Sequence, residues 1–254
     1  MGARVIAVAN QKGGVGKTTT AINISASLAA AEKRVLLLDL DPQGNSTSGV
    51  GMDRGAIRHS IYDFFTGEKP LDALVTPTVL PYLHLLPSRV ELFGAEVELV
   101  ARNGRETVLK EGLIPLLELY DYIIIDCPPA LGLLTVNALT AAGSVLIPVQ
   151  CEYYALEGLS QLLNTLELVK ASLNPGLQLE GILLTMHDQR NNLSKQVEDE
   201  IRKHFKDKVY KTMIPRNVSL SEAPSFGKPI ITYDIRSKGA QSYLSLAREV
   251  LGYV

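Results

Sequence analysis

The sequence has only two cysteines, no tract of low complexity and no long apolar run. Cys127 and Cys151 are too few and too isolated for a disulfide framework or a CxxC metal site, and we expect both to be small core residues. The chain begins MGARVIAVA, without the basic and apolar regions of a signal peptide. No run approaches the roughly 20 apolar residues that span a bilayer. We therefore expect a cytoplasmic protein with no membrane partner.

Charge is nearly balanced overall but unevenly distributed. The net charge is −2, which argues against a protein coated with nucleic acid. Residues 1–185 hold 13 Lys and Arg against 19 Asp and Glu, whereas residues 186–254 hold 12 against 8. This asymmetry is consistent with an anionic partner that meets the C-terminal part, and equally with an unevenly charged solvated surface.

Short apolar runs alternate with segments of helical period, the pattern of a parallel sheet with crossover helices. The runs are continuous rather than alternating, as in strands that are buried on both faces. We predict strands at 4–9, 34–40, 122–128, 144–150 and 179–186, and helices that include 156–169 and 240–251. Within residues 53–120 the strand signal is weaker, and we predict several helices and one short strand near 83–87 there. No linker or internal repeat is present, so we expect a single α/β domain over residues 1–254.

A glycine-rich loop, GGVGKTT, follows the first predicted strand and opens a helix over 18–31. A phosphate-binding loop needs glycines that let backbone N–H groups approach an anion at a helix N-terminus, a lysine for the β- and γ-phosphates, and a hydroxyl for Mg²⁺. Lys17 and Thr18 supply the last two. The motif predicts a P-loop NTPase fold, a mostly parallel twisted sheet with helices on both faces. Its nucleotide-binding residues are Gly13, Gly14, Val15, Gly16, Lys17, Thr18 and Thr19.

Three carboxylates lie at the predicted ends of strands. Asp39 and Asp41 follow one apolar run, and Asp126 ends another. Ligands of open α/β sheets bind at this edge, so at least one carboxylate can face the phosphates. A carboxylate at a strand end can instead cap the following helix, and for Asp39 the two roles are equally supported.

The loop departs from the standard GxxxxGK[ST] pattern, since Gln11 and Lys12 stand at its start. KGGVGKT is the deviant Walker A signature, and it is accompanied by LLLDLDPQGNSTSG, YIIIDCPPALG and IPRNVSLSEAPSFGKPI. Together these segments span nearly the whole chain. The sequence resembles the ParA/MinD family of deviant Walker A ATPases, and its last segment is particularly similar to the chromosomal ParA branch.

The resemblance implies roles for individual residues. Lys12 would reach across a two-fold interface to the partner's phosphates, as an arginine finger does in trans, so that ATP and Mg²⁺ join a homodimer. Asp41 would orient the attacking water, and Asp41 and Asp126 would meet Mg²⁺ through water. Pro215 and Asn217 would contact adenine, and no guanine-reading NKxD motif is present. The alternatives are a solvent-facing lysine and a plain turn at 215–217.

The resemblance further implies an ATPase of chromosome or plasmid partitioning. Its ATP-bound dimer would bind DNA non-specifically through Arg190 and Arg216, associate with the nucleoid, and be reset by hydrolysis that a ParB-type centromere-binding protein stimulates. A helix with Leu193, Val197 and Ile201 directed inward would expose basic residues between 195 and 206. Each arginine can also be an ordinary surface charge.

Two other functions are open. A MinD-like division-site ATPase ends in a basic amphipathic membrane helix, whereas this chain ends QSYLSLAREVLGYV, with a single Arg248 and an apolar face suited to docking. A relative of the nitrogenase iron protein needs two cysteines that hold a cluster. Cys127 follows Asp126, but Cys151 lacks the expected flanking pattern.

Overall fold

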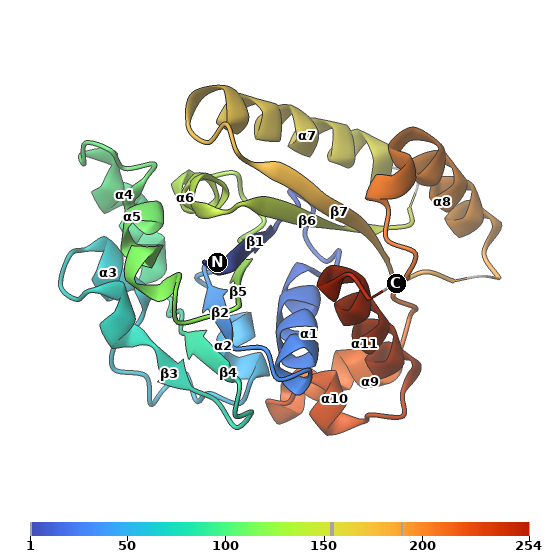
Figure 1. Cartoon of the computed structure of the whole chain (residues 1–254), viewed down its shortest axis with the longest axis horizontal. Coiled ribbons are helices and arrows are strands. Elements are labelled where there is room, and N and C mark those ends of the chain that lie inside the picture. The colour runs from blue at the N-terminus through green and yellow to red at the C-terminus, as the bar shows by residue number, and fades with distance from the viewer. Residues whose placement is uncertain (1, 153–154, 189, 254) are drawn as a thin grey trace.

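The computed structural model describes residues 2–152, 155–188 and 190–253. Its centre is one seven-stranded sheet in the order β3-β4-β2-β5-β1-β6-β7 (Figure 1). Among the described strands, only β3 is antiparallel to its neighbour, β4. The strands are β1 (Arg4–Val8), β2 (Val35–Asp39), β3 (Thr76–Pro77), β4 (Leu83–Leu86), β5 (Tyr122–Asp126), β6 (Ser144–Gln150) and β7 (Gln178–Thr185).

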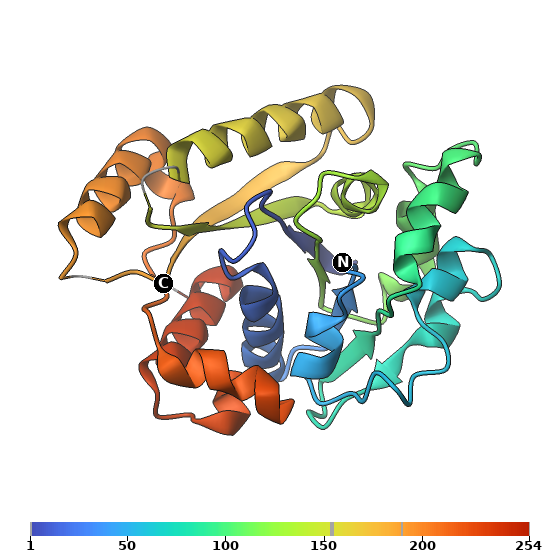
Figure 2. The same cartoon turned by 180° about the vertical axis from the view of Figure 1, so that it is seen from behind.

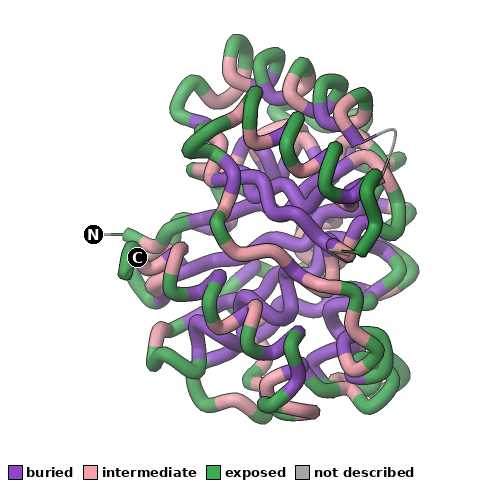
Figure 3. Tube along the Cα trace, turned by 90° about the vertical axis from the view of Figure 1, so that its right-hand side faces the viewer, coloured by how far each residue is buried: buried purple, intermediate pink, exposed green. Residues whose placement is uncertain are grey.

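Successive residues of each central strand enter two separate hydrophobic cores. In β1, Val5 and Ala7 pack on one side of the sheet, and Ile6 and Val8 pack on the other. The tube representation shows these buried strands between two more exposed outer layers (Figure 3). Because both faces are covered, the strands read as continuous apolar runs rather than as alternating ones.

The helices divide between the two faces of the sheet (Figures 1 and 2). One face is covered by α3 (Ile61–Phe65), α4 (Leu92–Val100), α5 (Val108–Leu113), α6 (Leu133–Ala141), α7 (Ala155–Ser172) and α8 (Asn192–Phe205). The other face is covered by α1 (Lys17–Ala30), α9 (Val218–Glu222), α10 (Ile230–Tyr233) and α11 (Lys238–Leu251), with the short α2 (Asn45–Gly49) beside them. Short 3₁₀ turns lie at Leu71–Leu74, Ile114–Leu116, Lys206–Lys208 and Ala223–Phe226.

The five predicted long strands, the short strand near 83–87 and the predicted helices are confirmed. The two-residue β3 was not predicted, because so short a segment has no periodicity. The prediction for Leu193 was wrong: its side chain is exposed, because the buried face of α8 is formed by Ser194, Val197 and Ile201, and Leu193 lies off that face. Cys127 and Cys151 are buried, as predicted. In the described parts of the chain, no helix is long and apolar enough to cross a membrane.

Candidate nucleotide site

The loop between β1 and α1 has backbone angles that favour glycine. Gly14 and Gly16 have φ values of 76° and 89°, in the left-handed region, and Gly16 is the N-cap of α1. A side chain at either position would be strained. No acidic residue occupies the first turn of α1, so its N-terminal N–H groups and dipole favour an anion. The loop is therefore built to hold phosphate.

Lys17 is the buried cation of this loop. Its side chain is shielded from water, and Nζ donates a hydrogen bond to the carbonyl oxygen of Lys12 at 3.1 Å. Burial lowers the pKa of Lys17, while the nearby Asp126, Cys127 and Asp41 oppose that shift. A desolvated ammonium group interacts more strongly with anions than one in water does, which suits a phosphate contact.

Asp39 has a structural role, which resolves the alternatives that the sequence left open. It is fully buried, and its Oδ1 accepts a hydrogen bond from the backbone N–H of Asp41 at 3.2 Å. Its Oδ2 accepts hydrogen bonds from the backbone N–H and the hydroxyl of Thr47, both at 2.7 Å. The Thr47 hydroxyl in turn accepts from the N–H of Ser88 at 3.0 Å. Asp39 therefore fastens the loop after β2 to the sheet, and so positions Asp41.

Asp126 is the carboxylate whose environment fits a hard cation. It lies opposite Asp39 in the parallel register of β2 and β5. Its Oδ2 accepts a hydrogen bond from Ser46 Oγ at 2.8 Å, whereas its buried Oδ1 has no hydrogen-bond partner among the described residues. Burial raises the pKa of Asp126, Asp39 raises it further, and the nearby hydroxyls of Ser46 and Thr18 oppose the shift.

These donors fit Mg²⁺. An orphaned carboxylate oxygen and the Thr18 hydroxyl meet at the phosphate loop, and a divalent cation would remove the penalty of ionising Asp126. In the described part of the chain, no three His, Cys, Asp or Glu side chains are arranged to hold a metal by themselves. Mg²⁺ sites commonly combine one or two protein oxygens with substrate phosphates and water.

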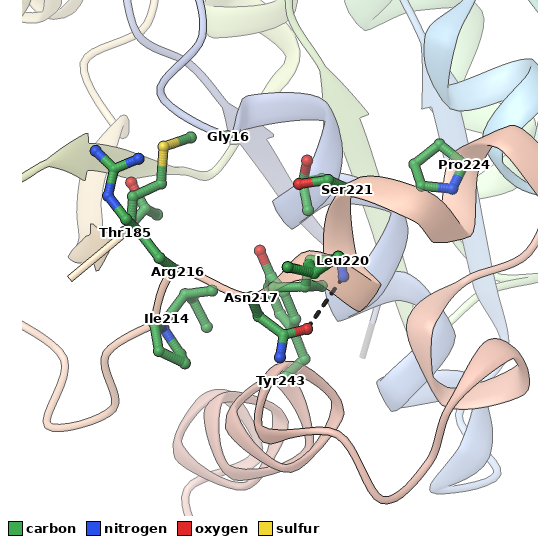
Figure 4. Close-up of a pocket in the computed structure, with 13 residues that line it drawn as sticks. Gly16, Thr185, Ile214, Arg216, Asn217, Leu220, Ser221, Pro224 and Tyr243 are labelled. Carbon is green, nitrogen blue, oxygen red and sulfur yellow. Dashed lines mark hydrogen bonds between the residues drawn. The ribbon is translucent and has the colours of Figure 1, made fainter. Parts of the chain in front are cut away.

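A cavity of about 460 Å³ opens beside the phosphate loop (Figure 4). Gly16 and Thr19 form its wall on the loop side, and Pro215 and Asn217 lie on the opposite segment. Asn217 Oδ1 accepts a hydrogen bond from Leu220 N at 3.1 Å and caps α9, which leaves the amide Nδ2 as a donor. The cavity has the size of a small-molecule site. It is also lined by Thr185, Met186, Ile214, Arg216, Val218, Leu220, Ser221, Pro224 and Tyr243.

Arg190 and Arg216 both lie beside Asp188. Two nitrogens of Arg190 donate hydrogen bonds to Asp188 at 3.2 Å, yet the Arg190 side chain is 91% exposed. Arg190 and then the nearby Arg216 lower the pKa of Asp188. A β-bridge between His187 and Pro215 joins the two segments. The structure thus brings together two arginines that are 26 residues apart in the sequence.

The structure adds a contact to Lys12 that the sequence did not indicate. Lys12 Nζ forms an ion pair with Glu152 Oε2 at 2.6 Å. Glu152 follows the end of β6, and Lys12 follows the end of the neighbouring β1. Ser46, which contacts Asp126, was also missed. Glu152 lies just past the end of β6, a position that could have indicated it, whereas Ser46 lies in α2, seven residues after β2, where no sequence signal indicates it.

Comparison with known proteins places this site in a family. A family model described as an AAA domain matches residues 3–179. The chain is 60% identical to the chromosome partitioning protein ParA of Myxococcus xanthus, over 98% of this chain and 88% of that protein. It is 58% identical to the sporulation initiation inhibitor protein Soj of Bacillus subtilis, over 97% and 98% of the two chains.

A solved structure shares the fold. It is described as cobyrinic acid a,c-diamide synthase from Mycobacterium smegmatis with bound ATP analogue and magnesium. Its sequence is 40% identical, the match covers 99% of this chain and 95% of that one, and the TM-score is 0.87. The sheet, the phosphate loop and these similarities agree, and the chain belongs to the ParA/MinD family of P-loop ATPases, within which it is similar to the partitioning proteins ParA and Soj.

Proposed function

We propose that residues 1–254 act as one ATPase domain of chromosome or plasmid partitioning, which binds DNA non-specifically as an ATP-bound dimer. Hydrolysis of ATP, stimulated by a ParB-type centromere-binding protein, returns the dimer to monomers. High identity to proteins named ParA and Soj supports this function. It exceeds the identity to the solved diamide synthase, so partitioning is favoured over amide synthesis.

One observation carries the link between nucleotide and DNA: Arg216 belongs to both surfaces. It lines the cavity beside the phosphate loop, and it also lies exposed near Asp188 and Arg190. Its N–H donates to the His187 carbonyl oxygen at 3.3 Å, which ties it to the segment that carries Arg190. A nucleotide in the cavity would therefore contact the segment that carries Arg216, which is joined by this hydrogen bond to the segment that carries Arg190. Arginine suits non-specific binding because it grips phosphate oxygens without reading bases.

The chain's own residues divide the work of hydrolysis. Loop N–H groups and Lys17 bind the phosphates, and Pro215 and Asn217 hold the adenine. Asp41, fixed by Asp39, orients the attacking water. Mg²⁺, held by Thr18 and through water by Asp41 and Asp126, would supply positive charge where the phosphate oxygens become more negative.

Lys12 supplies the remaining charge in trans. Phosphoryl transfer depends on positioning and electrostatic stabilisation, and a second lysine from the partner would complete a phosphate clamp that one chain leaves open. Because ATP would then lie between two loops, its hydrolysis would weaken the dimer. Dimerisation would switch on DNA binding, since the dimer carries twice as many DNA-contacting arginines as the monomer.

A sizing experiment with the Lys12→Ala variant tests this function. We expect the parent protein to sediment as a dimer with ATP and Mg²⁺ and as a monomer with ADP or no nucleotide. Lys12→Ala should bind ATP, because Lys17 and the loop amides remain, but should not dimerise. Its hydrolysis rate should fall by about 10³-fold or more. Lys110→Ala, an exposed lysine change on α5, is the matched control. Normal ATP-dependent dimers of Lys12→Ala would rule out the trans role.

The C-terminal helix bears on the membrane alternative. In α11, Ala240, Tyr243 and Ala247 are buried, and the Tyr243 hydroxyl lies 3.2 Å from the Thr20 hydroxyl of α1. This apolar face is therefore engaged with the body of the protein. A membrane helix of the MinD type needs its apolar face exposed.

A further inference from the structure

The ion pair between Lys12 and Glu152 joins two loops at the carboxyl edge of the sheet. Nζ and Oε2 lie 2.6 Å apart, and the side chains of Lys12 and Glu152 are 40% and 43% exposed. The residues are 140 positions apart in the sequence, but β1 and β6, which precede them, are adjacent parallel strands. The carboxylate therefore neutralises the family's second loop lysine within its own chain.

Further contacts hold both partners in place. Gln150 donates a hydrogen bond to the other carboxylate oxygen of Glu152. The backbone N–H of Lys12 donates to Asn10 Oδ1 at 3.0 Å, and Asn10 Nδ2 donates to the Pro148 carbonyl oxygen at 2.7 Å. Asn10 is buried, so it links the start of the phosphate loop to the end of β6. The ion pair is thus built on a fixed backbone frame and is not a chance meeting of two long side chains.

We propose that Glu152 is a positioning residue that restrains Lys12 within its own chain, and that dimerisation exchanges this carboxylate for the phosphates of the partner's ATP. The proposal rests on the proposed function, in which Lys12 acts in trans. An ammonium held by Glu152 is already charge-compensated, so dimerisation must break the pair before Lys12 contacts the partner's phosphates. Glu152 therefore opposes dimerisation until the partner's ATP offers a stronger anion. Its presence raises the dissociation constant of the ATP-bound dimer.

The size of the effect follows from the exposure of the pair. Partly exposed ion pairs are weak, and release of one such pair corresponds to about a threefold change in an equilibrium constant. A symmetric dimer breaks two pairs, one in each chain, so the combined effect is about tenfold. Glu152→Gln should therefore lower the dimer dissociation constant about tenfold with an ATP analogue that is not hydrolysed. The difference from the parent should shrink as salt rises, because ions screen the pair.

Two measurements test the proposal. The first is the rate at which an amine-reactive ester labels Lys12 in nucleotide-free protein, measured by mass spectrometry of the Lys12 peptide. Glu152→Gln should raise this rate about threefold, whereas Glu157→Gln, an exposed charge change on α7, should leave it unchanged. The second is sedimentation with the ATP analogue and Mg²⁺ over a range of protein concentrations, with nucleotide affinity checked by calorimetry.

The outcomes separate this proposal from the proposed function. Faster labelling together with tighter dimerisation at unchanged nucleotide affinity is the expected result. Unchanged labelling would show that the cis restraint does not exist in solution. Faster labelling with an unchanged dimer constant would show that the restraint does not oppose assembly, and weaker dimers would assign Glu152 a favourable contact with the partner. Each of these three results overturns the proposal. Failure of the trans-lysine function is detected separately, by normal dimers of Lys12→Ala.

Discussion

Asp126→Asn should stabilise the nucleotide-free protein at neutral pH while it removes a carboxylate that we propose serves hydrolysis. Burial and Asp39 raise the pKa of Asp126 from 3.8 to about 8, so the folded protein retains a proton that the unfolded chain releases. This contribution to stability is complete below pH 3.8 and is lost as the pH rises through the folded-state value. The parent's free energy of unfolding should therefore fall between about pH 4 and pH 8.

The magnitude is set by competing terms. One pKa unit corresponds to about 1.4 kcal/mol, so a three-unit difference at pH 7 corresponds to a penalty on the order of 4 kcal/mol. Asp39 carries an overlapping penalty, because burial raises its pKa to about 7. Removal of the Asp126 carboxylate therefore recovers only part of this penalty, on the order of 2 kcal/mol. The amide nitrogen that the substitution introduces is buried without a hydrogen-bond partner, which costs about 1 kcal/mol. We expect Asp126→Asn to be about 1 kcal/mol more stable at pH 7.5, and not more stable at pH 4.

Urea unfolding at several pH values, without nucleotide, measures this difference. Asp199→Asn, an exposed change on α8, is the control and should follow the parent at every pH. The reasoning would be refuted if Asp126→Asn had the same pH dependence as the parent, or if it were less stable at pH 8. In either case the buried carboxylate would be ionised at little cost. Magnesium-dependent ATP hydrolysis by Asp126→Asn should be strongly reduced, which would show a stability gain at a functional site.

Three more changes test single features of the site. Gly16→Ala should lower the free energy of unfolding by about 1–2 kcal/mol because its φ is 89°, whereas Gly13→Ala, with ordinary φ and nothing within 4 Å, should be near neutral in the same urea titration. Lys17→Ala should lose tight ATP binding in calorimetry; retained affinity would show that the loop amides suffice. Arg190→Glu should abolish DNA binding in an electrophoretic assay and keep ATP-dependent dimers. For the parent, the logarithm of the DNA-binding constant plotted against the logarithm of the salt concentration should have a slope of roughly −3 to −4, for about four phosphate contacts. Equal DNA affinity in ADP and ATP would contradict the proposed ATP-dependent switch.

The sequence by itself determined the sheet and the phosphate loop. A strand with a continuous apolar run, such as 122–128, is fully buried only when both faces of its sheet are covered. This favours a parallel sheet with helices on both sides. The spacing of glycines around Lys17 identified the loop because its backbone geometry excludes most other residues. These features are local, so a short stretch of sequence carries enough information to predict them.

Only the tertiary structure decided which polar groups meet. Asp39 and Asp41 are equivalent in the sequence as strand-end carboxylates, but Thr47 occupies one oxygen of Asp39 and makes it structural. The pairing of Lys12 with Glu152 depends on the adjacency of β1 and β6. The arginines around Asp188 meet because a β-bridge joins two distant segments. Strand order and side-chain direction set these contacts, and neither is encoded in a local pattern of residues.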